Sequence, residues 1–94
     1  MDKEEFKTKA KQSIDNVDRK IEELKEKSQS VEANSKQKYQ DALKDLEAKK
    51  SKLKNNYDQL KNAGEEKWDE AKKSFSEAND SFEDGFSKIK SILS

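Results

Sequence analysis

Cysteine, histidine and proline are all missing from this chain of 94 residues, and glycine occurs only twice. Without thiols or imidazoles the chain can form no disulfide, no zinc site of the usual kind and no nucleophile activated by histidine. Without proline, and with so little glycine, it also lacks the residues on which tight turns and β-hairpins depend. We therefore expect neither an all-β nor an α/β fold, and the length predicts a single domain over residues 1–94.

Long apolar runs are absent as well. No stretch approaches the roughly 20 apolar residues of a membrane-spanning helix. Residues 1–20 also contain no run of about 7–15 apolar residues, which a secretory signal needs. Together with the missing cysteines, these features are typical of a cytoplasmic protein.

Charge of one sign is not in excess, because 21 basic residues balance 21 acidic ones. Charged side chains make up 45% of the chain and hydrophobic ones 29%, a composition close to that of disordered proteins. Disordered chains usually carry a large net charge, whereas the opposite charges here are interleaved and can pair along a helix. Composition therefore leaves order undecided, and the pattern of apolar residues has to decide it.

Apolar residues recur in steps of three or four from Phe6 to Leu93, and we call this series the apolar stripe. Its 25 positions lie about 3.6 residues apart on average, which is the period of an α-helix. Most turns contribute one apolar residue, a width typical of a coiled-coil seam. The sequence therefore predicts an all-α fold with the stripe as its core. The members are Phe6, Ala10, Ile14, Val17, Ile21, Leu24, Ser28, Val31, Ser35, Tyr39, Ala42, Leu46, Lys50, Leu53, Tyr57, Leu60, Gly64, Trp68, Ala71, Phe75, Ala78, Phe82, Phe86, Ile89 and Leu93.

The clearest interruption is Asn62 to Glu65, where Gly64 occupies a stripe position. Glycine costs about 1 kcal/mol relative to alanine inside a helix, and Asn62 followed by Glu65 has the pattern of an N-cap with its reciprocal partner. We predict a helix over 3–61, a turn at 62–64 and a helix over 65–93, folded as an antiparallel coiled-coil hairpin. Residues 31–62 carry eight basic and five acidic side chains and residues 63–94 the reverse, so the turn brings opposite charges together.

This turn pairs residues at equal distances from it. We expect Tyr57 to face Trp68, and Leu46 to face Ala78. Large side chains then mostly lie opposite small ones, as interdigitation requires.

A second break is possible over residues 28–35, because serine and asparagine are mediocre helix formers and Ser28 and Ser35 weaken the stripe. It would give an up-down-up three-helix bundle. The segment has neither glycine nor proline and the stripe crosses it in phase, so the continuous first helix is favoured. That version leaves the Phe6–Leu24 seam uncovered in a monomer and requires a homo-oligomer or a protein partner.

Candidate chemistry is sparse. The polar stripe members Ser28, Ser35 and Lys50 have no histidine to work with, and we expect Lys50 to lay its stem on Phe75 with its ammonium in water. Gly64 and Gly85 form no phosphate-binding loop. The sequence predicts no catalytic residue, no cofactor and no metal ligand, and hence no enzyme.

A basic run over residues 49–54, with Tyr57 nearby, is the single candidate for nucleic-acid binding. Overall neutrality and the acidic last third of the chain favour a solvated helix face instead. We expect no nucleic-acid partner.

The aromatic series Trp68, Phe75, Phe82 and Phe86 has two interpretations. As core, it closes the hairpin, which makes the chain a structural or interaction protein. As the lipid-facing side of an amphipathic helix, it would order on a membrane surface or on drying. The net charge of −3 on this segment opposes adsorption to anionic lipid, so a membrane is the less favoured partner.

Several segments share a pattern with a known group of proteins. They are Lys3-Glu4-Glu5-Phe6-Lys7, Ile14 with Ile21 and Leu24, Lys38-Tyr39 with Leu43 and Leu46, and Gly64-Glu65-Glu66-Lys67-Trp68 followed by Ala71, Phe75, Phe82 and Phe86. These segments resemble a family of small bacterial coiled-coil proteins from cyanobacteria and Bacteroidetes, described as stress-response or uncharacterised proteins. The resemblance implies a non-enzymatic helical protein linked to stress. A looser likeness to desiccation-protective and apolipoprotein-type helices goes with the membrane alternative.

Overall fold

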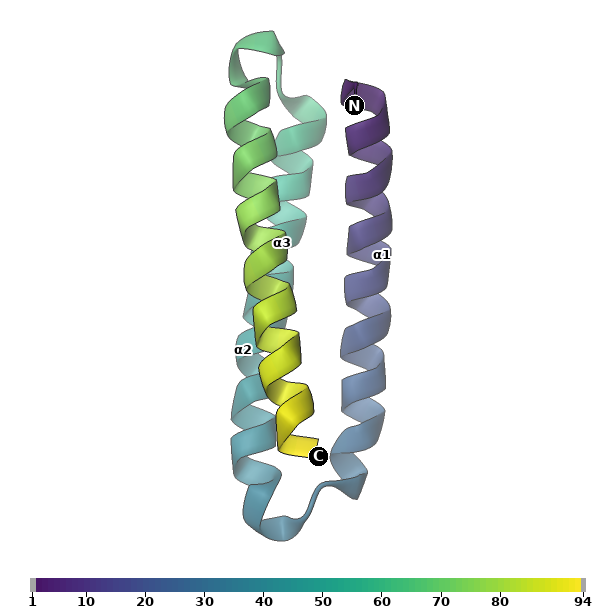
Figure 1. Cartoon of the computed structure of the whole chain (residues 1–94), viewed down its shortest axis with the longest axis vertical. Coiled ribbons are helices and arrows are strands. Elements are labelled where there is room, and N and C mark those ends of the chain that lie inside the picture. The colour runs from purple at the N-terminus through teal and green to yellow at the C-terminus, as the bar shows by residue number, and fades with distance from the viewer. Residues whose placement is uncertain (1, 94) are drawn as a thin grey trace.

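Three helices lie side by side in an up-down-up arrangement in the computed structural model, which describes residues 2–93 (Figure 1). Helix α1 spans Lys3–Lys27, α2 spans Ala33–Asn62 and α3 spans Glu65–Leu93, and a short 3₁₀ turn, η1, spans Ser28–Ser30. Residues 2–93 contain no strand, so the predicted all-α class is confirmed. The bundle measures 50 × 17 × 17 Å.

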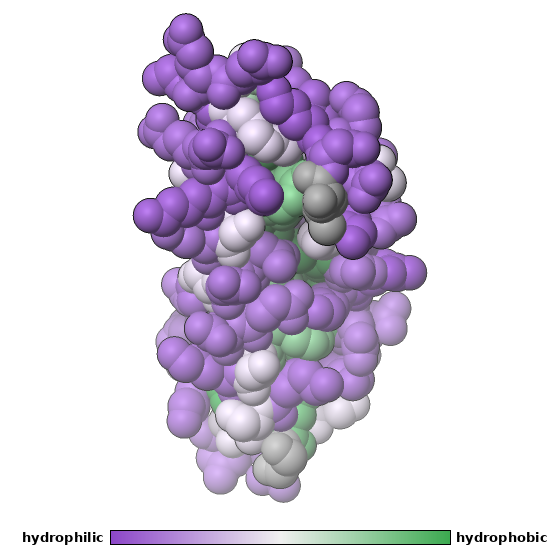
Figure 2. Space-filling view, turned by 45° about the horizontal axis from the view of Figure 1, so that its top comes forward, coloured by the Kyte–Doolittle hydropathy of each residue, from purple (hydrophilic) through white to green (hydrophobic). Residues whose placement is uncertain are grey.

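The core of the bundle is the apolar stripe. Each buried residue belongs to it, and Gly64 is its one exposed member. Figure 2 shows the consequence on one face, which is mostly hydrophilic with hydrophobic side chains visible only in narrow patches between polar ones. The buried residues are Ala10, Ile14, Val17, Ile21, Leu24, Tyr39, Leu46, Leu53, Leu60, Trp68, Phe75, Ala78, Phe82, Phe86 and Ile89.

The first helix is shorter than the sequence pattern favoured. It ends at Lys27 and α2 starts at Ala33, so the continuous helix over 3–61 is wrong and the three-helix alternative describes the chain. Ser28 helps to stop α1, because its hydroxyl donates a hydrogen bond to the Lys25 carbonyl oxygen at 2.7 Å and its amide bonds Leu24 and Lys25 oxygens. Folding back covers the α1 seam within one chain, and this burial outweighs the helical continuity that is lost.

The turn between α1 and α2 is fixed by a buried hydrogen bond. The Tyr39 hydroxyl donates to the Leu24 carbonyl oxygen at 2.5 Å, and the Tyr39 side chain is fully buried. Burial, with a smaller effect of the Glu23 charge, raises the pKa of the Tyr39 phenol above its usual value of 10.0. The first turns of α2 are thereby tied to the last turn of α1.

The turn between α2 and α3 lies where the sequence predicted it, at Ala63 and Gly64. The role predicted for Asn62 is wrong, however, because it is the last residue of α2 and its side-chain amide donates to the Asp58 carbonyl oxygen at 2.9 Å. The Gly64 carbonyl oxygen accepts the first helical bond of α3, from the Lys67 amide. A Cβ at Gly64 would meet nothing within 4 Å, so this position is open to solvent.

The register of α2 against α3 differs from the predicted one by about two turns. Tyr57 lies edge-on to Phe75, with ring centroids 6.4 Å apart, and Leu46 lies against Gly85. Side chains lean toward the N-terminus of their own helix, so those of α2 lean away from the turn and those of α3 lean toward it. The lean is about one residue position per helix, so it moves the contacts about two positions further along α3 and accounts for part of the shift.

Ion pairs between helices also differ from expectation. The opposite charges of the last two segments predicted attraction between α2 and α3, but every ion pair that joins two helices within residues 2–93 has one partner on α1. These pairs are Lys20–Glu83 at 2.8 Å, Lys25–Glu47 at 3.3 Å, Lys50–Asp18 at 3.3 Å and Lys54–Asp18 at 3.1 Å. Apolar packing closes the α2–α3 pair, and charge adds to the docking of α1.

Candidate interaction surfaces

The largest charge cluster across a helix contact surrounds Asp18 of α1. Its Oδ1 atom is buried and lies within 3.3 Å of the ammonium groups of Lys50 and Lys54 on α2. Burial by itself raises the pKa of the Asp18 carboxyl, but the contacts and charges of Lys54 and Lys50 outweigh it, so the net pKa is below 3.8. The cluster joins one carboxylate to two ammonium groups across the α1–α2 contact, and it orients α1.

Lys50 was expected to leave its ammonium in water, and this expectation is wrong because the ammonium pairs with Asp18. The sequence could not place α1 beside it. The sequence feature that could have indicated this contact is the spacing of Lys50 and Lys54, which lie four residues apart and therefore share one helix face.

The predicted basic run over residues 49–54 is largely occupied within the bundle. Besides the two lysines on Asp18, Lys49 pairs with Asp45 at 3.3 Å, while Lys52 is exposed. A surface that binds phosphates needs several free cations on one face. Three of the four lysines in this run are therefore held in ion pairs within the bundle, and Lys52 is the exposed one.

Ser28 and Ser35, the other polar stripe members, serve the turn between α1 and α2. The Ser28 hydroxyl is bonded to the Lys25 carbonyl oxygen, and the Ser35 amide bonds the Glu32 carbonyl oxygen at 3.0 Å. Both side chains are half-buried. The Ser28 side chain thus takes part in ending α1, whereas Ser35 takes part in the first turn of α2 through its backbone amide.

Four aromatic rings from all three helices form a cluster toward the end of the bundle that holds the α2–α3 turn and the start of α1. Phe6 is central, edge-on to Trp68 at 5.9 Å and to Phe75 at 6.2 Å between centroids, and Tyr57 joins through Phe75. Edge-to-face pairs contribute about 0.5–1.5 kcal/mol each beyond their burial. The series that the sequence singled out is therefore core here, completed by Phe6 of α1.

Lysine side chains cover this aromatic cluster. Lys3 and Lys7 lie over Trp68, with Nζ at 5.5 and 5.9 Å from the ring centroid. Lys72 lies over Phe6 at 5.3 Å, and Lys61 lies over Tyr57 at 5.2 Å. These cation–π contacts leave a basic rim around partly exposed rings. We call this surface the lysine-rimmed aromatic end.

The other two rings of the series, Phe82 and Phe86, are stacked at 6.4 Å near the opposite end of α3. Lys20 reaches across from α1, with Nζ 4.9 Å from the Phe86 centroid and 2.8 Å from Glu83. Lys90 covers the same ring at 5.4 Å. This side of the molecule is again helix–helix packing under cationic side chains.

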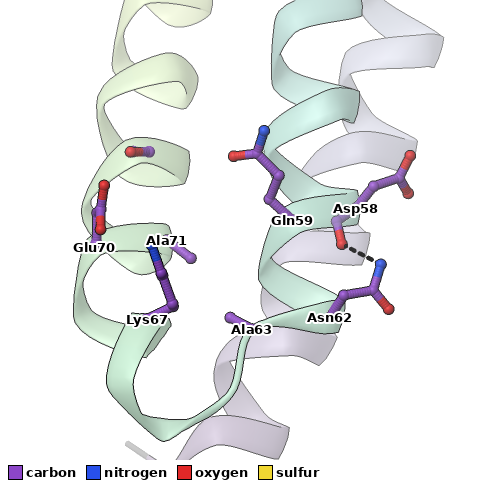
Figure 3. A pocket seen from close by; sticks show the side chains of 8 residues that line it. Asp58, Gln59, Asn62, Ala63, Lys67, Glu70 and Ala71 are labelled. Carbon is purple, nitrogen blue, oxygen red and sulfur yellow. Dashed lines mark hydrogen bonds between the residues drawn. The ribbon is translucent and has the colours of Figure 1, made fainter.

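An open hollow of about 510 Å³ lies between α2 and α3 beside their turn. In Figure 3 the side chains of Gln59 and Glu70 stand on its two facing walls. Its polar groups are partly occupied, because Asn62 bonds Asp58 and Lys61 lies 3.7 Å from Asp58. None of the residues that line this hollow has a buried side-chain nitrogen or oxygen without a hydrogen bond. The lining residues are Asp58, Gln59, Asn62, Ala63, Lys67, Glu70, Ala71 and Ser74.

Among the described residues, no group of three or more acidic side chains is placed to hold a metal ion. No helix of residues 2–93 combines the length and apolar character needed to cross a membrane. The surfaces available for contact are therefore helix faces. They belong to the hairpin of α2 and α3 and to the amphipathic helix α1 that packs against it.

Comparison with protein family models, with curated proteins and with solved structures finds no match for this chain.

Proposed function

We propose that this chain is a non-enzymatic helical protein that acts through helix–helix contact, with further copies of itself or with a protein partner. The observation that carries the proposal is the single apolar seam, which runs through all three helices and is covered by helix packing alone. Any antiparallel helix with the same apolar period and matching charges can use the face on which α1 sits. We further propose a cytoplasmic location and a role linked to stress.

The apolar seam contributes most of the free energy of this docking. Full burial of a large aliphatic side chain contributes about 1.5–3 kcal/mol, and α1 buries Val17, Ile21 and Leu24 almost completely. Each exposed ion pair contributes at most about 1 kcal/mol. Apolar contact therefore supplies the affinity for a docked helix, and the ion pairs on α1 set its orientation.

Circular dichroism and analytical ultracentrifugation in plain buffer test the proposal. We expect high helicity and one cooperative melting transition. Ile21→Asp, which puts a charge into the seam, removes both, whereas the exposed Gln12→Asp retains both. A wild-type chain that is largely unstructured in buffer contradicts the proposal. The stress link is tested separately, by deleting the gene in the source organism and measuring survival under heat, osmotic and oxidative challenge.

A second candidate is binding to a membrane surface through the lysine-rimmed aromatic end. Lysines around aromatic rings are typical of segments that adsorb to anionic lipid. The test is a titration with phosphatidylglycerol vesicles and with phosphatidylcholine vesicles, monitored by Trp68 emission and by helicity. Membrane binding predicts a blue shift with the anionic vesicles that is lost in Lys3→Glu/Lys7→Glu. An unmoved emission maximum rejects it.

A further inference from the structure

We propose that two copies of this chain exchange α1: in each copy α1 and α2 join into one straight helix, and α1 docks on the α2–α3 hairpin of the other copy. This inference rests on the proposed helix–helix function and names its partner as a second copy of this chain. It is drawn from the backbone of the first turn, the phase of the apolar stripe and the symmetry of the contacts between α1 and α2.

The connection between α1 and α2 departs very little from helix. Ser28 has helical dihedral angles, and η1 continues as a 3₁₀ turn through Ser30. The extended residues are Val31, with ψ 134°, and Glu32, with ψ 149°. The segment has no glycine, no proline and no positive φ. Rotating ψ at two residues therefore converts the turn into a continuous helix without steric strain.

The apolar stripe stays in phase through this connection. Leu24 is followed by Ser28, Val31, Ser35 and Tyr39 in steps of four, three, four and four residues. In a straight helix these positions share one face. The face that α1 buries and the face that α2 buries then form one continuous seam along a helix of about 60 residues, roughly 90 Å long.

The contacts between α1 and α2 are close to symmetric about the connection. The sequence midpoint of Asp18 and Lys50 is residue 34, and that of Lys25 and Glu47 is residue 36. The bonded pair of Leu24 and Tyr39 is centred between residues 31 and 32. Two straight helices that cross antiparallel at this point reproduce the same pairs between copies, as an interface with twofold symmetry requires.

The twofold axis passes close to Val31 and Ser35. Val31 is half-buried in the single chain and packs at the edge of the core. In the exchanged dimer it lies where the two helices cross, against the second copy's helix near Ser35, and the small side chains at positions 28 and 35 let the two helices approach closely. The apolar position in the middle of an otherwise polar turn thus acquires a partner.

The two forms share their core and their ion pairs. The dimer gains helical residues at both connections and the contact at its centre, and it loses the translational freedom of one chain. The equilibrium therefore depends on concentration and on the helix propensity of residues 28–32. Monomer dominates in dilute solution, and dimer accumulates when the chain is refolded at high concentration.

Two matched variants shift this equilibrium in opposite directions. Glu32→Pro suits the monomer, because Glu32 has φ −59° and is preceded by an extended residue, but it stops a continuous helix. Ser28→Ala/Ser30→Ala favours the continuous helix. We expect the dimer association constant, from sedimentation after refolding, to fall at least about a hundredfold in the proline variant. It rises about tenfold in the alanine variant, since each dimer contains two connections and each connection carries both substitutions.

Cross-linking identifies exchange directly, because the chain has no cysteine of its own. Lys25→Cys and Glu47→Cys in one chain place two thiols where α1 meets α2, and a short bis-maleimide joins them. In an exchanged dimer the bridge links two chains, so the isolated dimer fraction runs as a covalent dimer on a denaturing gel. Two closed bundles that associate through their outer surfaces give only bridged monomers.

Exchange is overturned if the wild type and the alanine variant both remain monomeric after concentrated refolding, or if the dimer fraction bridges within single chains. It is also overturned if a folded Glu32→Pro, verified by its helicity and melting, forms dimer as readily as the wild type. A helical chain that melts cooperatively but fails these tests leaves the proposed function standing. An unstructured chain removes both.

Discussion

At Gly85, helices α2 and α3 approach closely. A Cβ placed there would lie 2.9 Å from Leu46 Cδ1 and 3.2 Å from Lys49 Nζ, and Leu46 is almost fully buried. A large side chain at this position forces the two helices apart.

We expect Gly85→Leu to lower the free energy of unfolding by about 1–3 kcal/mol, because overpacking exceeds the gain in helix propensity. The control is Ser87→Leu on the exposed side of the same helix, which changes stability by less than about 0.5 kcal/mol. Urea unfolding measures both. Equal stability of the two variants contradicts the assigned register of α2 against α3.

Tyr39 combines full burial with a hydrogen bond to the Leu24 carbonyl oxygen. Tyr39→Phe keeps the ring and removes the bond, and the Ser28 amide still satisfies Leu24. We expect a loss of about 0.5–1.5 kcal/mol at neutral pH. Tyr39→Ala leaves a cavity as well, and costs about 3–5 kcal/mol. Thermal or urea unfolding gives both values.

The raised pKa of Tyr39 adds a pH dependence. Because the folded state holds the phenolic proton more tightly than the unfolded state, the contribution to stability is complete below pH 10.0 and declines as the pH rises above that value. The difference in unfolding free energy between wild type and Tyr39→Phe therefore shrinks in alkaline solution. A constant difference across this range contradicts the buried position of the hydroxyl.

At the scale of elements, helix existence was predictable and helix ends were not. The stripe determines which side of each helix is buried, and 15 of its members between Ala10 and Ile89 form the core. The break at residues 28–32 depends on two opposing free energies. An unbroken helix keeps its backbone hydrogen bonds, whereas a break lets the apolar side chains of α1 be buried, and the residue pattern does not tell which contribution is larger. Gly64 is a strong local signal for the second turn, whereas the serines and the asparagine at the first turn are a weaker one.

The contacts between elements were the least predictable part. Phe6 reaches Trp68 and Phe75 only because α1 returns alongside α3, and Asp18 meets Lys50 for the same reason. Side-chain lean, which the pairing by distance from the turn left out, accounts for about two residues of the two-turn shift at Tyr57. The interaction surfaces follow from these contacts. The sequence could not predict them, because it did not predict that α1 packs against the α2–α3 hairpin of the same chain.

The attachment of α1 carries its own pH signature through Asp18. Since the folded carboxyl has a lower pKa than the unfolded one, the unfolded state binds more protons in acid. The stabilisation is present above pH 3.8 and is lost as the pH falls through the folded pKa. Asp18→Asn removes this stabilisation, which is at most about 1 kcal/mol because the side chain is partly exposed.

Hydrogen exchange of the α1 amides, followed from acid to neutral pH, measures the stabilisation that the Asp18 ion pairs give to α1. We expect the protection of α1 in the wild type to exceed that in Asp18→Asn at neutral pH and to converge with it in acid. Exposed Asp15→Asn, whose carboxylate pairs with Lys11 within α1 at 3.7 Å, is the control. Identical profiles for wild type and Asp18→Asn would show that the ion pairs to α2 do not orient α1.

At the scale of the whole molecule, the three-helix arrangement gives a short rod that hides its own seam. The Cα radius of gyration is 15.1 Å, and the long axis is 50 Å. A hairpin with a continuous first helix of about 57 residues would extend about 85 Å, and an unfolded chain of this length would have a radius of gyration of about 30 Å. Solution scattering distinguishes these three shapes by their radius of gyration and maximum dimension.

The most direct measurement is small-angle X-ray scattering on the chain refolded and kept in dilute solution. We expect a monomer whose radius of gyration is close to the 15.1 Å of the bundle and whose maximum dimension is near 50 Å. A radius near about 30 Å would mean that the seam is open and the chain unfolded. A rod of about 85 Å at every concentration would mean that the first helix is continuous and that one chain alone never covers its seam.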